Sequence, residues 1–259
     1  MAAVQLSDLT LCYDGVPLFE RFDFALPEKR WTVLLGKSGI GKSTLLRAIA
    51  GLEDEAITHG KIERLGTIGY MAQQDSLFPW LSVLDNVQLA HHLNGTKNAD
   101  TAEHAKRLLT SVKMQEHADK ACYQLSGGQR QRVALARVLM QQADIVLMDE
   151  PFSALDAVTR RQLQNLACDL LKDKTVLLIT HDPQEALRLG DEIYILQHQP
   201  VTLSEKIAPQ GDKPRLLNDQ NLWQLQEKLL AELMSDDTED LDGRDETFFA
   251  PSFQRQESE

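Results

Sequence analysis

The sequence predicts an α/β fold with a mostly parallel sheet core, an antiparallel β region at the N-terminus and an inserted helical subdomain. Three observations support this prediction. Apolar strand-like runs alternate with helical patterns, a glycine-rich turn separates a strand from a helix at residues 36–43, and a purely helical pattern occupies residues 83–140. Alternating strands and helices are typical of parallel sheets with helices on their faces.

The first half of the chain contains strands and then a helical block. Residues 3–11 and 17–26 alternate enough to predict two strands around a turn at Asp14-Gly15. Residues 31–35 (WTVLL) form a short apolar strand, and residues 43–52 have helical spacing that Gly51 is expected to stop. A second β signal covers residues 61–71. From residue 83 to 139 the pattern is helical, with polar interruptions near 94–100 and 115–120.

The second half returns to strands and ends in an acidic tail. Strands are expected at 145–148, 175–180 and 192–196, with a helix at 158–171. We therefore expect a discontinuous core of residues 1–82 and 141–200, and a helical subdomain of residues 83–140. In the C-terminal segment 201–234, Asn218 or Asp219 is expected to cap a short helix through Leu233. Residues 235–259 are strongly acidic and predict disorder.

Composition narrows the class of protein. Of 259 residues, 42% are apolar and 25% charged, which are ordinary values for a globular protein. The net charge of −12 lies mostly in the tail, so no basic surface for nucleic acid is expected. Three cysteines without paired spacing indicate free thiols in a reducing compartment. We see neither a signal peptide nor an 18-residue apolar run, so we expect a cytoplasmic protein that meets a membrane only through a partner.

A phosphate-binding loop of the P-loop NTPase type follows the strand at 31–35. The segment GKSGIGKST consists of Gly36, Lys37, Ser38, Gly39, Ile40, Gly41, Lys42, Ser43 and Thr44. Its glycines let backbone N–H groups converge on phosphate oxygens, and the helix N-terminus adds a favourable dipole. Lys42 is expected to pair with the β- and γ-phosphates, and Ser43 to bind Mg²⁺. The sequence therefore predicts a nucleotide site here.

An acidic pair, Asp149 and Glu150, ends the apolar run at 145–148. A carboxylate there can reach the Mg²⁺ shell from what we expect to be the neighbouring strand, which makes Asp149 the metal-side acid. Glu150 stands where it can polarise an attacking water. The alternative is a strand that ends in a solvated Asp-Glu turn.

A second glycine-rich segment, LSGGQ, lies between these two motifs. It contributes Ser126, Gly127, Gly128 and Gln129, and a helical run follows it. Backbone N–H groups at a helix start form an anion site. Taken alone, the segment favours a plain linker or helix cap. In this order with the other two motifs it indicates a second phosphate-binding surface, acting on a nucleotide held mainly by another copy of the fold.

These motifs together resemble the ATP-binding subunits of ABC transporters over residues 3–200. The resemblance implies four further site residues. Tyr13 stands where the family places an aromatic ring on adenine, although it is also consistent with a strand-end tyrosine. Gln73 matches the glutamine that contacts Mg²⁺ and the attacking water, with Gln74 as the alternative register. Asp156, in SALD, matches the aspartate that communicates across a dimer, and His181 matches the histidine that touches the γ-phosphate.

The resemblance also implies partners and a mechanism. Two copies would close head to tail around two ATP molecules with Mg²⁺, each held between Lys42 of one copy and residues 126–128 of the other. Glu150 would activate water, and His181 would stabilise the γ-phosphoryl group. The work would be done on an integral membrane permease at the cytoplasmic face of the membrane, with an extracytoplasmic substrate-binding protein as an indirect partner.

A further part of the sequence concerns the process that the ATP hydrolysis would drive. Pro79-Trp80 and Asp85-Asn86-Val87 resemble the importer branch for nitrate, taurine, aliphatic sulfonates and thiamine precursors. Trp80 is also consistent with packing inside the subunit. The chain departs from that branch at Gln129 and at Cys122-Tyr123, where other residues are common. The alternatives are an exporter or lipoprotein-releasing subunit and a non-transport relative acting on DNA or ribosomes.

Overall fold

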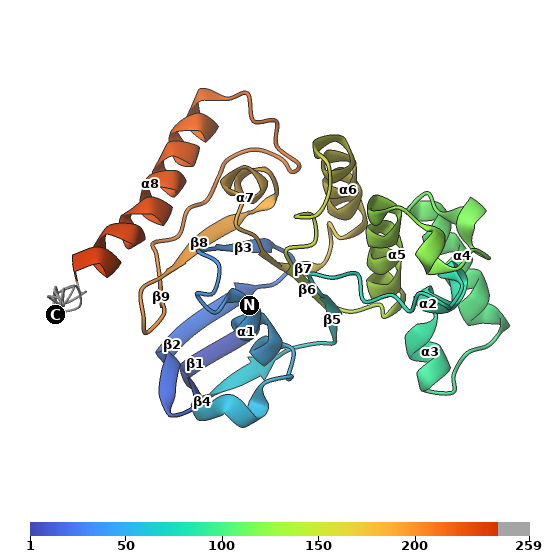
Figure 1. Ribbon diagram of the computed structural model, residues 1–259, viewed down its shortest axis with the longest axis horizontal. Coiled ribbons are helices and arrows are strands. Elements are labelled where there is room, and N and C mark those ends of the chain that lie inside the picture. The colour runs from blue at the N-terminus through green and yellow to red at the C-terminus, as the bar shows by residue number, and fades with distance from the viewer. Residues whose placement is uncertain (243–259) are drawn as a thin grey trace, which may run out of the picture.

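The computed structural model describes the backbone of residues 1–242 and the side chains of residues 1–234. Its strands form two sheets (Figure 1). A three-stranded antiparallel sheet has the order β2-β1-β4, with β1 (Ala2–Tyr13), β2 (Val16–Pro27) and β4 (Ile57–Arg64). The larger sheet has the order β5-β6-β7-β3-β8-β9, with β3 (Trp31–Leu35), β5 (Ile68–Met71), β6 (Ile145–Asp149), β7 (Thr175–Ile179), β8 (Glu192–Gln197) and β9 (Thr202–Leu203). Strands β5, β6, β7, β3 and β8 are parallel, and β9 is antiparallel to β8.

The helices fall into a central group, an inserted group and a C-terminal helix. The bounds are α1 (Lys42–Ile49), α2 (Val83–Val87), α3 (Leu89–Leu93), α4 (Ala99–Ser111), α5 (Gly127–Met140), α6 (Ala157–Leu170), α7 (Pro183–Leu189) and α8 (Gln220–Asp242). Short 3₁₀ turns lie at Asp54–Ala56, Gln115–His117 and Cys122–Gln124. The expected α/β class, with an antiparallel N-terminal region and helices between sheet strands, is confirmed.

The N-terminal hairpin forms where the sequence predicts it. Tyr13 pairs with Val16, and the two residues between them, Asp14 and Gly15, have φ angles of 50° and 78°. Positive φ at both central positions is the geometry of a type I′ turn, which matches the twist of paired strands. The expected stop at Gly51 is also present, because α1 ends at Ile49 and Gly51 has a φ of 77°.

The β signal at residues 61–71 is two strands in different sheets rather than one. Strand β4 ends at Arg64 in the antiparallel sheet, and β5 begins at Ile68 at the edge of the parallel sheet. Gly66, between them, has a φ of 128°, and a Cβ there would lie 2.8 Å from the Asp144 Cβ. The chain therefore changes sheets at a glycine that a larger residue could not replace.

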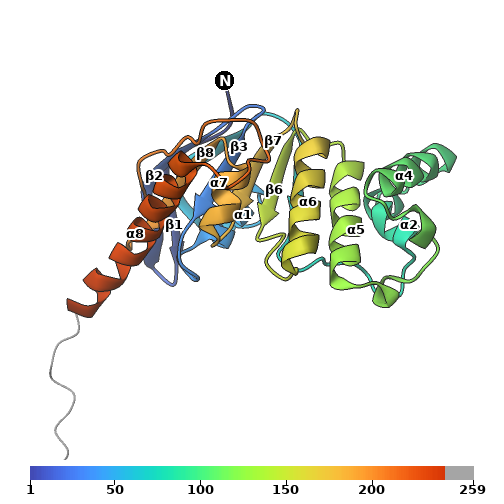
Figure 2. The same ribbon diagram turned by 90° about the horizontal axis from the view of Figure 1, so that it is seen from above.

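The two faces of the parallel sheet build two cores. Leu34, Leu147 and Leu177 point into the core shared with the antiparallel sheet and α1. Their neighbours Val33 and Met148 belong to the core on the opposite face, which α5, α6, α7 and α8 cover. Strands buried on both faces explain why β3, β6 and β7 are continuous apolar runs. Figures 1 and 2 show the sheet lying between α1 and the helices of the other face.

The C-terminal helix α8 differs from its prediction in length. Asp219 precedes it and accepts the Asn221 N–H at 2.8 Å, so the cap is Asp219 rather than Asn218. The helix continues through Asp242, beyond the expected end at Leu233 and into the segment predicted to be disordered. No glycine or proline interrupts residues 220–242, and the first glycine is Gly243. The rest of the predicted disordered tail, 243–259, lies outside the described residues.

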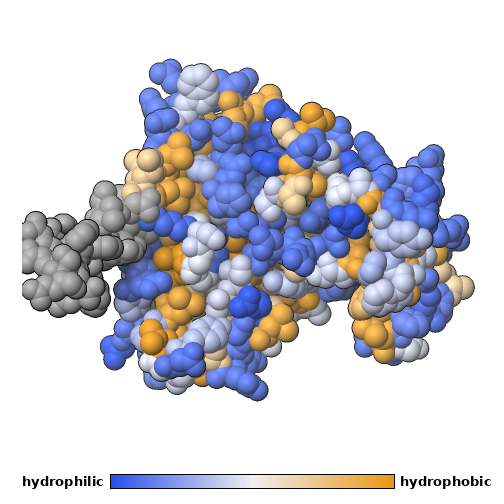
Figure 3. Space-filling view, viewed as in Figure 1, coloured by the Kyte–Doolittle hydropathy of each residue, from blue (hydrophilic) through white to orange (hydrophobic). Residues whose placement is uncertain are grey.

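Helix α8 packs through Leu222 and Leu229, which are 6% and 0% exposed. Its outer side carries the exposed Trp223 and Met234, and Figure 3 shows hydrophobic residues among polar ones over this helix. Within residues 1–242, no helix combines the length and the apolarity that crossing a membrane requires.

Candidate active site

The predicted site residues follow the carboxyl ends of adjacent parallel strands. In the sheet register, Asp149 of β6 pairs with Ile179 of β7, which pairs with Leu34 of β3. Met71 of β5 pairs with Met148 of β6. The segments that follow these strands begin at the same edge of the sheet, where doubly wound folds place their ligands. The fold thus brings Gln73, Glu150, His181 and the glycine-rich loop to one edge.

The loop at residues 36–43 has a backbone that glycine makes possible. Gly36 and Gly41 have φ angles of 155° and 105°. A Cβ at Gly36 would lie 3.0 Å from the Leu196 carbonyl oxygen, and one at Gly41 would lie 3.0 Å from Leu18 Cδ2. Gly41 is also the N-cap of α1 and carries no side chain that could bond the first N–H groups of the helix. Those groups are left for an anionic ligand.

Lys42 is held inside this loop. Its Nζ donates to the carbonyl oxygens of Gly36 and Lys37, both at 2.6 Å, and the residue is 5% exposed. Burial lowers the pKa of Lys42, while Glu150 and Asp149 act in the opposite direction. An ammonium group has three N–H donors, so two bonds to the loop position it and leave one donor for a phosphate oxygen.

Ser43 and Asp149 are directly bonded. The Ser43 hydroxyl donates to Asp149 Oδ1 at 2.9 Å, and Asp149 is 5% exposed. Burial raises the pKa of Asp149, and the neighbouring Glu150 raises it further, whereas the bond from Ser43 lowers it. The expectation that Asp149 reaches this point from the strand next to β3 is wrong, because β7 lies between β3 and β6. The contact instead runs through α1, which packs over β6.

Glu150 and His181 lie beside each other at the same edge of the sheet. Glu150 Oε2 lies 3.1 Å from His181 Nδ1, and the two side chains are 17% and 59% exposed. Glu150 has a φ of 44°, a strained value for a non-glycine residue. Its N–H donates to the Ile179 carbonyl at 3.0 Å, and Ser153 donates to its carbonyl at 3.0 Å. The surrounding bonds therefore hold Glu150 in a turn that directs its side chain toward the exposed histidine.

Two further predicted site residues, Gln73 and Tyr13, are also exposed. Gln73 lies two residues beyond the end of β5 and is exposed, as is its neighbour Gln74. Tyr13, 39% exposed, ends β1 and donates to Glu53 Oε2 at 2.7 Å. Glu53 also accepts from Arg47 Nε at 2.6 Å. Sequence reasoning missed Glu53 and Arg47, because a bond that ties the end of β1 to α1 leaves no signature in spacing.

Ser126 and Gln129 close a capping box at the start of α5. The Gln129 N–H donates to Ser126 Oγ at 3.3 Å, and the Ser126 N–H donates to Gln129 Oε1 at 2.9 Å. Gln129 Nε2 lies 2.9 Å from His117 Nε2. Gly127 is exposed, and a Cβ on Gly128 would lie 2.5 Å from Thr159 Cγ2. The side chain of Gln129 is thus engaged within the chain, while Ser126 and Gly127 face solvent.

The structure does not bring this helix start to the glycine-rich loop of the same chain. Helix α5 packs against α2, α4, α6 and β5. In both ribbon views β6 and α6 lie between α1 and α5 (Figures 1 and 2). Asp156 caps α6, accepting from the N–H groups of Val158 and Thr159. The predicted residues therefore form two separate groups.

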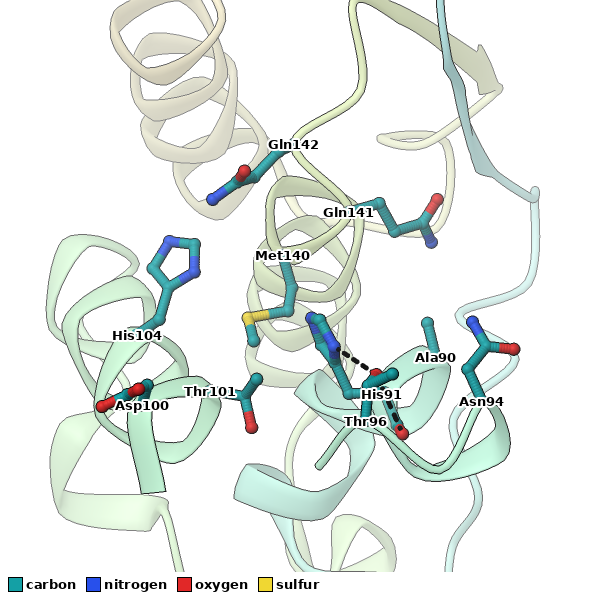
Figure 4. Close-up of a pocket in the computed structure, with 10 residues that line it drawn as sticks. All are labelled: Ala90, His91, Asn94, Thr96, Asp100, Thr101, His104, Met140, Gln141 and Gln142. Carbon is teal, nitrogen blue, oxygen red and sulfur yellow. Dashed lines mark hydrogen bonds between the residues drawn. The ribbon is translucent and has the colours of Figure 1, made fainter. Parts of the chain in front are cut away.

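Two cavities have no residue of the glycine-rich loop in their lining. One of about 260 Å³ is lined by His181 and Ser153 together with Arg160 and Glu185, two residues that sequence reasoning missed. Another of about 650 Å³ lies among α3, α4 and the end of α5 (Figure 4), where His91 Nδ1 is 2.9 Å from Thr96 Oγ1. Among the described residues, no group of three or more His, Cys, Asp or Glu side chains is arranged to hold a metal.

A glycine-rich loop with a buried lysine, and two adjacent carboxylates at the end of β6, define a P-loop nucleotide-hydrolysing protein. Residues 19–153, more than half of the chain, match the family model described as ABC transporter. The chain therefore belongs to the ABC transporter family, as an ATP-binding subunit that hydrolyses ATP.

Relatives and a solved structure agree with this assignment. An uncharacterized ABC transporter ATP-binding protein of Haemophilus influenzae is 53% identical over 89% of this chain and 98% of its own length. An aliphatic sulfonates import ATP-binding protein of Rhodococcus jostii is 43% identical over 87% of this chain and 91% of its own. A taurine import ATP-binding protein of Rhizobium johnstonii is 42% identical, covering 87% and 92%. A dimeric bacterial ABC transporter cassette superposes with a TM-score of 0.69 at 28% identity, covering 81% and 100%.

Proposed function

We propose that this protein is the ATPase subunit of an importer for small molecules of the nitrate, sulfonate, taurine or thiamine-precursor type. Relatives named for aliphatic sulfonate and taurine import support this substrate range. In this proposal two copies close head to tail around two ATP molecules at the cytoplasmic face of the membrane. They act on an integral permease that an extracytoplasmic binding protein supplies with substrate.

The observation that carries the proposed head-to-tail dimer is the separation of the glycine-rich loop from the LSGGQ segment within one chain. Lys42 belongs to α1, Ser126 caps α5, and strand β6 and helix α6 lie between these helices. The exposed Ser126 hydroxyl and Gly127 N–H thus have no phosphate to bind within their own chain. A second copy, placed head to tail, supplies that phosphate from its own glycine-rich loop.

Mg²⁺ fits the residues at the end of β6. A buried carboxylate bonded to the hydroxyl of Ser43 offers hard oxygen ligands. Asp149 and Ser43, with Gln73 from the segment that follows β5, would hold the ion. When bound, Mg²⁺ neutralises charge on the β- and γ-phosphate oxygens.

The chain's own residues would carry out the rest of the chemistry. Lys42, already aligned by two carbonyl oxygens, would donate its third N–H to the γ-phosphate. Glu150 would orient a water for attack and accept its proton, and His181, 3.1 Å from Glu150, would donate to the γ-phosphate oxygens. Closure by Ser126–Gly128 of the second copy would exclude solvent and complete the site, so that hydrolysis follows dimerisation. Tyr13 would stack on adenine, and Asp156 would lie near the dimer interface.

An exposed aromatic patch is our candidate for the permease contact. Phe78 and Trp80 stack edge to face, with ring centroids 5.4 Å apart, and Trp80 is 71% exposed. Tyr123, 69% exposed, is joined to them because its N–H donates to the Pro79 carbonyl at 3.3 Å. The alternative of Trp80 packing inside the subunit does not match this exposure. Aromatic side chains with little cover favour a protein interface.

Affinity purification of the tagged full chain from detergent-solubilised native membranes tests the import proposal. We expect a polytopic membrane protein among the partners identified by mass spectrometry, together with an extracytoplasmic binding protein. A Trp80→Ala variant should lose the membrane partner and keep basal ATPase activity. Recovery of ribosomes or DNA-associated proteins without a membrane partner would overturn the transport role, and a permease without a binding protein would favour the exporter or lipoprotein-releasing alternative.

A further inference from the structure

A buried glutamate lies behind the histidine of the candidate site. Glu185, in α7, is 5% exposed and lines both the 260 Å³ cavity beside His181 and an adjoining cavity of about 210 Å³. Its carboxylate is four residues from His181 along the chain, and the mechanism above does not use it. A buried carboxylate at such a position requires hydrogen-bond partners.

One partner of Glu185 belongs to the turn that carries His181. Thr180 lines the 260 Å³ cavity together with Glu185, and its hydroxyl lowers the pKa of the Glu185 carboxyl. The Thr180 hydroxyl oxygen accepts the N–H of Asp182 at 3.1 Å. Thr180 and Asp182 are the residues on either side of His181, so this bond fixes the backbone around the histidine. Removing the carboxylate would take away the charged group that the Thr180 hydroxyl faces.

The other partner ties Glu185 to α6. Gln164 Nε2 donates to Glu185 Oε1 at 2.9 Å, and Gln164 is 4% exposed. A second connection is parallel to it, because Arg160 Nη1 of α6 lies 3.6 Å from Asp182 Oδ2. Arg160 also donates to the Leu155 carbonyl at 3.0 Å, next to the α6 cap Asp156. The turn of His181 and the start of α6 are therefore linked through Glu185 and Arg160.

We propose that Glu185 is a positioning residue for ATP hydrolysis, whose carboxylate joins α6 to the Thr180–Asp182 turn and so holds His181 where it meets the γ-phosphate. This inference rests on the proposed role of His181. It extends that role to the proposed dimer, because a second copy that contacts the Asp156 end of α6 moves the histidine through the same bonds.

The charge of Glu185 is sensitive to pH. Burial raises its pKa to about 7, against the bonds from Thr180 and Gln164. Asp182 raises the pKa as well, and Arg160 lowers it. Arg161 and Arg188 line the smaller cavity with Glu185, and His181 lines the larger one. The ionised carboxylate accepts the hydrogen bond from Gln164 more strongly than the neutral acid, so the link to α6 tightens as pH rises through about 7.

The test measures kcat and the KM for ATP of the purified full chain in four variants. Glu185→Ala removes the link, Thr180→Val removes the hydroxyl that faces Glu185 and accepts the Asp182 N–H, and His181→Ala removes the histidine. Gln184→Ala, an exposed neighbour on α7, is the control. We expect Glu185→Ala and Thr180→Val to lower kcat by about ten- to hundredfold through misplacement of His181, with KM unchanged. Thermal unfolding checks folding, and Thr180→Val carries the test if Glu185→Ala does not fold.

A double variant separates positioning from a general structural effect. In single-turnover assays, Glu185→Ala should cause no further loss when His181 is already alanine. Equal further loss in that background would overturn the inference, and so would a Glu185→Ala rate equal to that of Gln184→Ala. If His181→Ala itself turns over normally, the proposed role of His181 is wrong and the inference falls with it.

A pH profile adds a measurement that lost packing would not change. Glu185→Gln keeps the shape but has no charge to gain, so the ratio of wild-type to variant kcat should rise between about pH 6 and about pH 8. A constant ratio would contradict the role of the carboxylate charge.

Discussion

The glycine-rich loop at Gly36–Ser43 and the LSGGQ segment at Leu125–Gln129 are both helix starts rich in glycine, but the chain completes them differently. In the first, a buried lysine and the Ser43–Asp149 bond supply charges from the same chain. In the second, Ser126 and Gln129 satisfy each other, and the charged group beside the backbone, Arg130, donates to the Leu125 carbonyl at 2.8 Å. In our proposal the first is therefore a complete phosphate site within one chain, and the second is half of a site. Four experiments test this difference.

The largest effect is expected at Glu150. Glu150→Gln should lower kcat by about 10²–10⁴-fold, because the amide cannot accept the proton of the attacking water. ATP binding should remain, since the loop around Lys42 is complete without it. Light scattering should then show an ATP-dependent dimer. A variant that stays monomeric, or one that turns over normally, would contradict the assignment of Glu150 and the composite site.

Mixing two inactive variants tests whether the two segments belong to different chains of one site. Lys42→Ala disables the first segment, and Ser126→Arg blocks the second, so each variant alone should lack ATPase activity. In a mixed dimer one site combines the intact Lys42 with the intact Ser126. We expect activity to return on mixing. If both segments served a site within one chain, every chain in the mixture would be defective and no activity would return. Gln162→Ala, mixed with either variant, is the control.

The free energy of unfolding is expected to depend on pH through the buried carboxyl of Glu185. The pKa of Glu185 is raised by burial from 4.5 to about 7 in the folded state. The folded state therefore binds the proton more tightly, and stability falls as pH rises from 4.5 through about 7. Glu185→Gln should be more stable than wild type at about pH 8, by on the order of 3 kcal/mol, and nearly equal at about pH 4. Urea unfolding at both pH values measures this, with the exposed Glu63→Gln as control.

The smallest effect is expected at Gln129. Its side chain closes the capping box of α5, so Gln129→Ala should cost about 1 kcal/mol of stability by the loss of that box. The KM for ATP should change little, because the outward-facing groups of the segment are those of Ser126 and Gly127. Thermal unfolding and steady-state kinetics decide between a capping and a ligand-binding side chain. A large rise in KM with unchanged stability would reverse our interpretation.

Much of the molecule was predictable because its determinants are local. The phosphate loop needs a strand, glycines at positive φ and a helix start, all within residues 31–49. The hairpin at Asp14-Gly15 and the buried strands β3, β6 and β7 follow from turn chemistry and apolar runs. The resemblance of LSGGQ to the family was equally local. The ABC transporter assignment rests on these segments, and the comparisons agree with it.

The rest depended on contacts between segments distant in sequence. Only the tertiary structure decided that residues 61–71 divide between two sheets and that β7 separates β3 from β6. Only packing joined Gln164 to Glu185 and Arg47 to Glu53, pairs in which neither partner belongs to a recognisable motif. The physical reason is the sequence distance over which each determinant acts. Propensity, turn geometry and apolar periodicity act over a few residues and are written in the sequence, whereas strand order and buried polar pairs arise only when remote segments are brought together.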